Sequence, residues 1–169
     1  LADFIQSKYI LLFGWNPTSA IKWVYLPRIL TRAIEKGARL VVVDPYLSDT
    51  AAKGHDWLAI RPGTDGALAL ALAHCIIRDG LYDKDFVENW TVGFDKYVEY
   101  VKDKTPEWAE KITSIPAYKI EEVAHDLATI KPAVVDAWSG PGQHTNGVQG
   151  GRAIAALAAL IGGYDRPGT

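Results

Sequence analysis

Apolar residues along the chain form short unbroken runs that are separated by longer stretches with helical spacing. The runs at residues 9–13 (YILLF) and 40–43 (LVVV) contain no polar residue and the run at 133–138 (AVVDAW) contains one, so none alternates as a half-exposed strand would; this is typical of strands buried on both faces. Residues 57–60 form a weaker strand candidate. These runs predict a mostly parallel sheet that is covered on both sides.

The stretch between the first two runs has the pattern of a helix. Residues 17–19 (PTS) offer helix-starting chemistry, apolar residues such as Ile21, Val24 and Ile29 follow at helical spacing, and Gly37 would end the helix. A strand, a helix and a second strand within about thirty residues predict a right-handed βαβ unit.

Three further stretches predict helices. Residues 66–78 form a long apolar helix that Thr64 or Asp65 would cap, residues 83–128 are helical in pieces, and residues 148–161 form an alanine-rich helix. The breaks in the middle stretch are expected at Gly93, Pro106 and Pro116.

This order of elements predicts an α/β fold: a three-layer, Rossmann-like, mostly parallel sheet with helices on both faces. The 169 residues fit one domain with its own core. We interpret residues 1–169 as a single dinucleotide-binding domain that is a fragment of a larger multidomain chain, since the sequence has no methionine and runs from Leu1 to an abrupt RPGT.

Composition narrows the possible partners and chemistry. A net charge of -2 gives no reason to expect nucleic acid as a partner, and the longest apolar stretch, 153–163, is too short to insert directly into a membrane. Cys75 is the only cysteine, which excludes a disulfide framework, an iron–sulfur site and a Cys-rich zinc site within this chain. We expect Cys75 to be a buried core residue.

Ligands of parallel α/β sheets bind beyond the carboxyl ends of the strands, where this chain places its polar and glycine-rich segments. These segments are 14–16, 44–45, 62–65 and 139–147. The first strand is followed by G-W-N-P and not by G-x-G-x-x-G, which argues against an NAD-type dehydrogenase domain.

Three polar side chains at these ends have two readings each. Asp44 could accept hydrogen bonds from ribose hydroxyls or could cap the turn before Pro45. Asp65 could accept from two adjacent N–H groups of a guanine edge or could cap a helix. Asn16 could add a base contact or stabilise its own loop.

The segment 139–147 (SGPGQHTNG) would suit an anion such as pyrophosphate, through backbone N–H groups and the start of the next helix. Gly140 and Gly142 would let the backbone approach a ligand, and we expect Gly142 in particular to tolerate side chains poorly. His144 could contact a ligand or be an exposed or capping side chain.

Four segments in this order resemble the DMSO reductase family of molybdopterin oxidoreductases. They are FGWNP (13–17), VVVDPYLSDTAAKGHDWLAIRPGTDGALALALAH (41–74), LYDKDFVENWTVGFD (81–95) and GPGQHTNGVQGGRAIAALAALIGGYDRPGT (140–169). The resemblance covers essentially the entire chain. One departure is Tyr46, where many members have arginine after Asp-Pro, so a charged contact is not expected there.

The resemblance implies a bis-molybdopterin guanine dinucleotide cofactor with molybdenum or tungsten. It implies that Asn16, Asp44 and Asp65 surround the guanosine end of one dinucleotide and that the 140–144 loop lies near the pyrophosphate or pterin. The expected cofactor-binding residues are Gly14, Asn16, Asp44, Pro62, Gly63, Asp65, Gly140, Gly142 and His144.

The same resemblance implies that the 4Fe-4S cluster region and the metal ligand precede this segment and that a second cofactor-clamping domain follows it. The expected partners are those remaining domains and an iron–sulfur electron-transfer subunit. The isolated fragment is expected to be inactive and to hold no metal. Residues 81–95 lean towards thiosulfate or polysulfide reductase-like parents, with formate dehydrogenase-like and hydratase-like parents open. The alternative from another class is a stand-alone nucleotide-binding module without catalysis.

Overall fold

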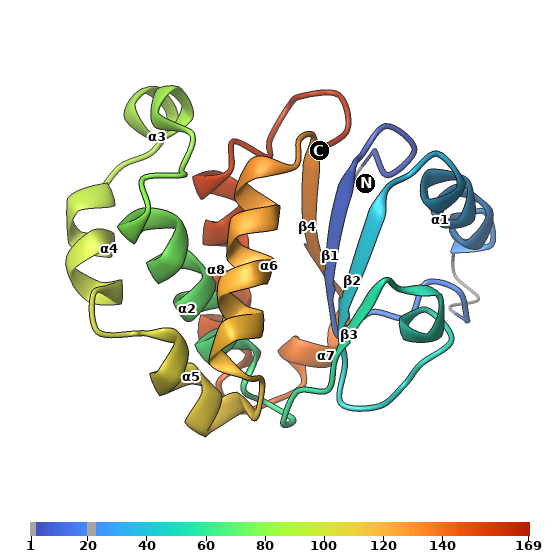
Figure 1. The fold of residues 1–169 in the computed structure, drawn as a ribbon, viewed down its shortest axis with the longest axis horizontal. Helices are drawn as coiled ribbons and strands as arrows, with labels where there is room; N and C mark the ends of the chain where they lie inside the picture. The colour runs from blue at the N-terminus through green and yellow to red at the C-terminus, as the bar shows by residue number, and fades with distance from the viewer. Residues whose placement is uncertain (1–2, 20–22) are drawn as a thin grey trace.

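Four parallel strands form one sheet at the centre of the structure, a computed structural model that describes residues 3–19 and 23–169 (Figure 1). The strand order is β3-β2-β1-β4. The strands are β1 (Tyr9–Phe13), β2 (Arg39–Val43), β3 (Asp56–Leu58) and β4 (Ala133–Ala137). The predicted α/β class with a parallel sheet is confirmed.

The unbroken apolar run of β1 is explained by burial on both of its faces. Tyr9, Leu11 and Phe13 contribute to one core cluster, while Ile10 and Leu12 contribute to the other. Successive side chains of a strand point to opposite faces, so both faces of the sheet need apolar residues. β1 pairs with β2 on one side and with β4 on the other, so it is a central strand of the sheet.

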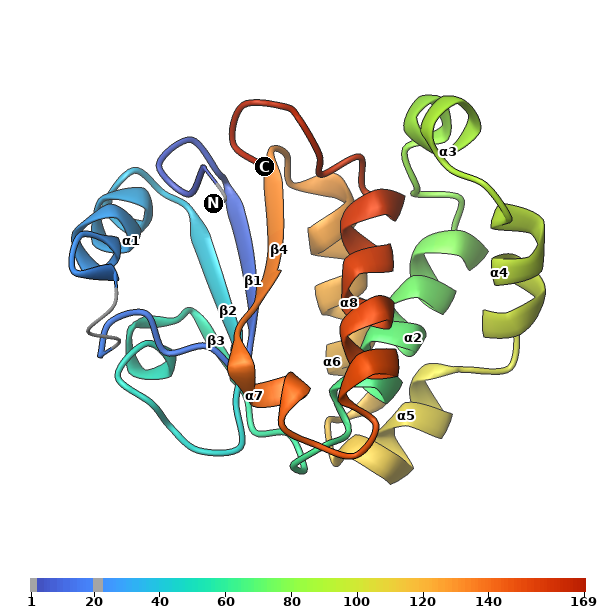
Figure 2. The ribbon, with the colours of Figure 1, turned by 180° about the vertical axis from the view of Figure 1, so that it is seen from behind.

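Helices cover both faces of the sheet, as predicted. α1 lies on one face, α2, α6 and α8 lie on the other, and α3, α4 and α5 form an outer layer beyond α2 (Figure 1 and Figure 2). The helices are α1 (Leu26–Glu35), η2 (Ala51–Lys53), α2 (Asp65–Arg78), α3 (Lys84–Trp90), α4 (Phe94–Val101), α5 (Pro106–Thr113), α6 (Ala117–Thr129), α7 (Ser139–Gly142) and α8 (Gly147–Leu160).

The predicted breaks in the helical stretch are confirmed. α4 starts after Gly93, whose positive φ of 81° suits glycine, and α5 starts at Pro106. α6 follows Pro116. Side chains cap two helices in this part of the chain. Asp83 accepts from the Phe86 N–H at the start of α3, and the Thr105 hydroxyl accepts from the Trp108 N–H at the start of α5.

Two local predictions were wrong in detail. α1 begins only at Leu26, with a proline in its first turn, while Val24 is 78 % exposed. The predicted apolar position Ile21 lies outside the described residues. At α2, Thr64 occupies the cap position, but its hydroxyl donates to the Arg61 carbonyl, so no side chain caps this helix.

Cys75 is a core residue, as expected. It is 2 % exposed within α2, and burial raises the pKa of its thiol to about 12. A thiol with so high a pKa stays protonated and unreactive at neutral pH.

A cluster of ion pairs ties β2 and β3 to α6 at the amino-terminal end of the sheet. The Arg39 guanidinium donates to Asp56 and Glu122, both at 2.7 Å, and to Asp126 at 2.5 Å. Burial opposes ionisation of Asp56, but hydrogen bonds from Lys119 and Arg39 lower its pKa overall. Hydrogen bonds from the same two cations lower the pKa of Glu122.

We expect Arg39→Met to lower the free energy of unfolding by about 1 kcal/mol at pH 7, because the pairs are only partly shielded from water. Carboxylates with lowered pKa values stabilise the fold above their unfolded-state pKa and lose this contribution as the pH falls through the folded value. Urea unfolding at pH 7 and pH 3 should therefore show a smaller difference between variant and wild type at pH 3. An equal loss at both pH values would contradict an electrostatic role.

Candidate functional site

The predicted site residues follow the carboxyl ends of the strands, along the lower edge of the sheet in Figure 1. The strand order places β1 between β2 and β4, so the connections after β1 and β4 leave on opposite sides of the sheet. A parallel sheet opens a crevice at such a point. The structure divides the predicted residues here into separate groups.

Gly14 and Gly140 form the first group, in which two loops pack backbone against backbone. A Cβ on Gly140 would lie 2.8 Å from the Gly14 carbonyl oxygen, and a Cβ on Gly14 would lie 2.5 Å from Cδ of Pro141. The Gly140 N–H also donates to the Gly14 carbonyl at 3.3 Å, and Gly14 has a φ of +51°. These two glycines are therefore required by contact between the loops.

The expectation for Gly142 was wrong as far as the fold is concerned. Its backbone has no positive φ, and a Cβ there would have no neighbour within 4 Å. The crowded residue of this turn is Gly147, whose Cβ would lie 2.6 Å from the Gly142 carbonyl oxygen. A close approach of a ligand to Gly142 stays a prediction.

Asp65 and Asp44 are two buried carboxylates at this edge, 7 % and 5 % exposed. Oδ1 of Asp44 accepts from the Tyr46 N–H at 3.2 Å, which fits the turn-capping reading. The Asp44 main chain is also fixed, since its carbonyl accepts from Nε1 of Trp57 at 2.8 Å. Asp44 is thus held at the end of β2 with acceptor capacity left on its side chain.

Asp65 is the first residue of α2 and has few partners. Burial raises the pKa of its carboxyl, the residue's own backbone N–H and His144 lower it, and Asp44 raises it further. The net pKa is raised, and within residues 3–19 and 23–169 no side chain donates a hydrogen bond to this carboxylate; His144 acts on it only through its charge. A carboxylate that is mostly removed from water and has so few protein donors would gain from a ligand that donates to it.

His144 and Gly63 bring the loop after β4 against the loop before α2. A Cβ on Gly63 would lie 3.2 Å from Cγ and Nδ1 of His144, so the imidazole covers this glycine, which has a φ of +77°. Nδ2 of Asn146 donates to the Gly63 carbonyl at 3.0 Å. His144 itself is exposed, and so is Pro62 beside the contact.

Asn16 lies in a separate group and stabilises loops. Its Oδ1 accepts from the Thr50 N–H at 3.2 Å, from the Thr50 hydroxyl at 2.7 Å and from the Thr18 hydroxyl at 3.1 Å. These bonds join the loop after β1 to the loop after β2. The side-chain oxygen is therefore used within the protein, as the loop-stabilising reading predicts.

The helices α2 and α8 begin side by side at the same edge. A Cβ on Gly66 would lie 3.1 Å from Cα of Gly150, so the first turns of the two helices are in close contact. Helix N-termini carry unpaired N–H groups and a partial positive charge that favour anions. The carboxyl-end edge of the sheet thus carries hydrogen-bond donors, the N–H groups at the starts of α2 and α8, and hydrogen-bond acceptors, the carboxylates of Asp44 and Asp65.

Comparison with known proteins places this arrangement in a family. Residues 1–169 match the family model described as molybdopterin oxidoreductase. The chain belongs to the molybdopterin oxidoreductase family. This confirms the resemblance found in the sequence.

Individual relatives agree with the family. The chain is 40 % identical to the probable dimethyl sulfoxide reductase chain YnfF of Escherichia coli over 95 % of its length, and 37 % identical to the thiosulfate reductase molybdopterin-containing subunit PhsA of Salmonella typhimurium over 98 %. The structure of acetylene hydratase from Pelobacter acetylenicus superposes with a TM-score of 0.91 at 34 % identity over 99 % of the chain. The chain spans 23 %, 22 % and 23 % of these three relatives.

Sequence reasoning about this molybdopterin oxidoreductase domain missed two features of the edge. Asn146 positions Gly63, and its place just before a helix could have marked it as a residue to watch. Trp138 stacks on Trp15 with centroids 5.8 Å apart. Trp15 is 2 % exposed and packs inside the protein, whereas Trp138 is 42 % exposed at the end of β4.

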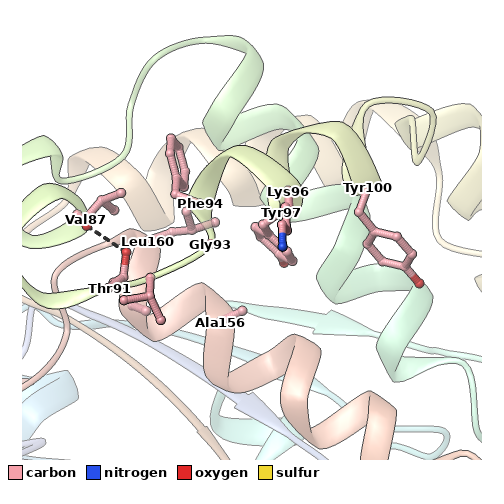
Figure 3. A pocket seen from close by; sticks show the side chains of 11 residues that line it. Val87, Thr91, Gly93, Phe94, Lys96, Tyr97, Tyr100, Ala156 and Leu160 are labelled. Atoms are coloured by element: carbon pink, nitrogen blue, oxygen red, sulfur yellow. Dashed lines mark hydrogen bonds between the residues drawn. The ribbon is translucent and has the colours of Figure 1, made fainter.

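A cavity of about 410 Å³ lies elsewhere in this molybdopterin oxidoreductase domain, between α4 and α8 (Figure 3). Phe94, Tyr97 and Tyr100 of α4 line it together with Ala156 and Leu160 of α8. It contains none of the predicted site residues and no acidic side chain. Aromatic and aliphatic walls offer packing and little chemistry.

Two searches of the described residues complete the description. Residues 3–19 and 23–169 contain no group of three histidine, cysteine, aspartate or glutamate side chains arranged to hold a metal ion. In the same residues, no helix has both the length and the apolar character needed to cross a membrane.

Proposed function

We propose that this chain is the part of a molybdopterin-dependent oxidoreductase subunit that binds the guanosine and pyrophosphate of a molybdopterin guanine dinucleotide. Family membership and the share of 22–23 % of two oxidoreductase relatives support the assignment to a larger subunit. The observation that carries the proposal is Asp65, a buried carboxylate with too few donors.

Guanine supplies what Asp65 lacks. Its ring N–H and exocyclic amine are adjacent donors that can bond the two oxygens of one carboxylate. Adenine would present a ring acceptor to the same carboxylate, which is unfavourable. Charge-assisted hydrogen bonds of this kind each contribute about 1.5–3 kcal/mol when shielded from water.

The neighbouring groups fit the rest of such a nucleotide. Asp44 keeps acceptor capacity for ribose hydroxyls at the end of β2. The first turns of α2 and α8, joined at Gly66 and Gly150, would face the pyrophosphate with N–H groups. His144, exposed beside Gly63, could donate to the same anion.

The bound cofactor would supply metal-centred redox chemistry, while the residues of this chain bind and orient one end of it. In this proposal the metal ligand, the 4Fe-4S region and the second clamping domain lie in other parts of the subunit, so the chain alone is inactive. An iron–sulfur electron-transfer subunit is the proposed partner. A thiosulfate or polysulfide reductase-like parent is supported by the similarity to the thiosulfate reductase subunit.

The test is nucleotide preference, measured by calorimetry or chemical-shift mapping with GDP and ADP. We expect wild type to bind GDP at least about fivefold more tightly than ADP, and Asp65→Ala to lose this preference. Asp95→Ala is the matched control, since Asp95 also lies in the first turn of a helix but is exposed. Equal binding of both nucleotides by wild type, or an unchanged preference in Asp65→Ala, would remove Asp65 from this role.

A further inference from the structure

β4 lies at one end of the sheet, and the described part of the chain provides it with one strand partner only, β1. In a parallel strand, the backbone groups of alternate residues point to opposite sides. The Trp138 N–H donates to the Phe13 carbonyl at 3.3 Å, and the Pro132 carbonyl accepts from the Lys8 N–H at 2.8 Å. The backbone N–H and C=O groups of even-numbered residues in and next to β4 therefore point to β1, and those of odd-numbered residues point to the free edge.

Only some of the backbone N–H and C=O groups at the free edge of β4 form hydrogen bonds. The outward N–H and C=O groups of Val135 and the outward C=O of Ala133 form no hydrogen bond within the described residues. The Ala137 N–H donates to Oδ1 of its neighbour Asp136 at 2.8 Å, which closes the edge at that end. Val135 is half-buried, so its unpaired groups have poor access to water.

A groove of about 570 Å³ runs along this edge, between β4 and α8. The α8 wall consists of the small residues Gly151, Ala155 and Ala158, together with Ile154. Small residues at this spacing leave room beside the strand. Unpaired backbone groups on one side of the groove and a low apolar wall on the other suit an extended polypeptide.

We propose that the groove holds one extended strand, parallel to β4, that comes from the rest of the full-length subunit. The inference rests on the proposed function only in taking the chain as part of a longer subunit. Relatives of which this chain spans about a quarter contain ample additional polypeptide. Thr169 lines the groove and lies beside the start of β4, so polypeptide following it in a longer protein would enter parallel to β4 (Figure 2).

The geometry fixes the expected hydrogen bonds. The strand residue opposite Val134 donates its N–H to the Ala133 carbonyl and accepts from the Val135 N–H. The next pair would need the Ala137 N–H, which Asp136 holds. Pairing therefore extends from Ala133 to Val135 and ends where Asp136 covers the edge.

Residue-resolved amide hydrogen exchange of the full-length subunit tests this. The Val134 N–H points to β1 and is the internal control for a folded sheet. We expect the Val135 N–H to exchange at least roughly tenfold more slowly than an unprotected amide, together with a slow Val134. A slow Val134 with an unprotected Val135 would overturn the proposal.

Two further measurements separate the alternatives. Protection of Val135 that disappears when the subunit is diluted to a monomer would assign the groove to a second copy and overturn the proposal. In the Asp65→Ala subunit, Val135 should keep its protection whether or not nucleotide preference changes. The nucleotide preference of the Asp65 variant thus tests guanosine binding, and amide exchange at Val135 tests strand pairing, so the two proposals can fail separately.

Discussion

Replacing Gly140 with alanine should lower the free energy of unfolding by about 3 kcal/mol, whereas Gly142→Ala should change it by less than about 1 kcal/mol. The added methyl group at Gly140 meets the Gly14 carbonyl oxygen at 2.8 Å, and backbone cannot move aside as a flexible side chain can. At Gly142 the same group enters open space. Urea unfolding followed by tryptophan fluorescence measures both.

The two variants remove glycines two residues apart, in the same turn, and lose the same chain flexibility. Their difference therefore reports the contact with Gly14 alone. Equal stabilities of Gly140→Ala and Gly142→Ala would mean that the loops after β1 and β4 can separate at little cost. The packing described for this edge would then be wrong.

Asp65→Asn should stabilise the nucleotide-free chain by about 2 kcal/mol at pH 7 while weakening its preference for GDP. The substitution keeps the shape of the side chain and removes a buried charge whose pKa is raised. The helix N-terminus offsets part of the cost of that charge, by about 0.3–1 kcal/mol. Urea unfolding of wild type and variant, without and with GDP, measures both effects.

The pH dependence has a definite sign. A carboxyl with a raised folded-state pKa binds more protons in the folded state than in the unfolded state. The wild type therefore loses stability as the pH rises from the unfolded-state pKa to the folded-state pKa. The advantage of Asp65→Asn should grow as the pH rises above about 3.9, the ordinary carboxyl pKa, and vanish well below it, where the carboxyl is protonated in both states. If Asp65 stabilised α2 as a cap, the asparagine would instead bring no gain at any pH.

The sheet and most helices could be predicted because their signals are local. The run YILLF reports burial of β1 on both faces, and Gly93, Pro106 and Pro116 each break a helix by their own backbone chemistry. The start of α1 was harder, because helix-starting residues at 17–19 precede Leu26 by a full two turns. Local preference there is overridden by the loop that Asn16 holds.

The site was predictable as a set of segments and not as a set of contacts. In the sequence G-P-G, Gly140 and Gly142 are equivalent, and only the approach of Gly14 from a distant loop makes one of them indispensable. The same holds for Asn16, whose partner Thr50 lies 34 residues away. The number of hydrogen-bond donors near Asp65 depends on which segments pack around it in the folded chain, and the local sequence does not contain this information.

The pairing of β1 with β4 joins Tyr9 to Ala133, across about 120 residues of chain. Contacts of such long range form late, because closing a long loop costs entropy before the contact is gained. During synthesis β1, α1, β2 and β3 can assemble while β4 is still absent, but Gly14 then lacks its contact with Gly140. The edge that we propose binds the nucleotide is therefore complete only once β4 has paired with β1, so on this proposal nucleotide binding would follow completion of the domain.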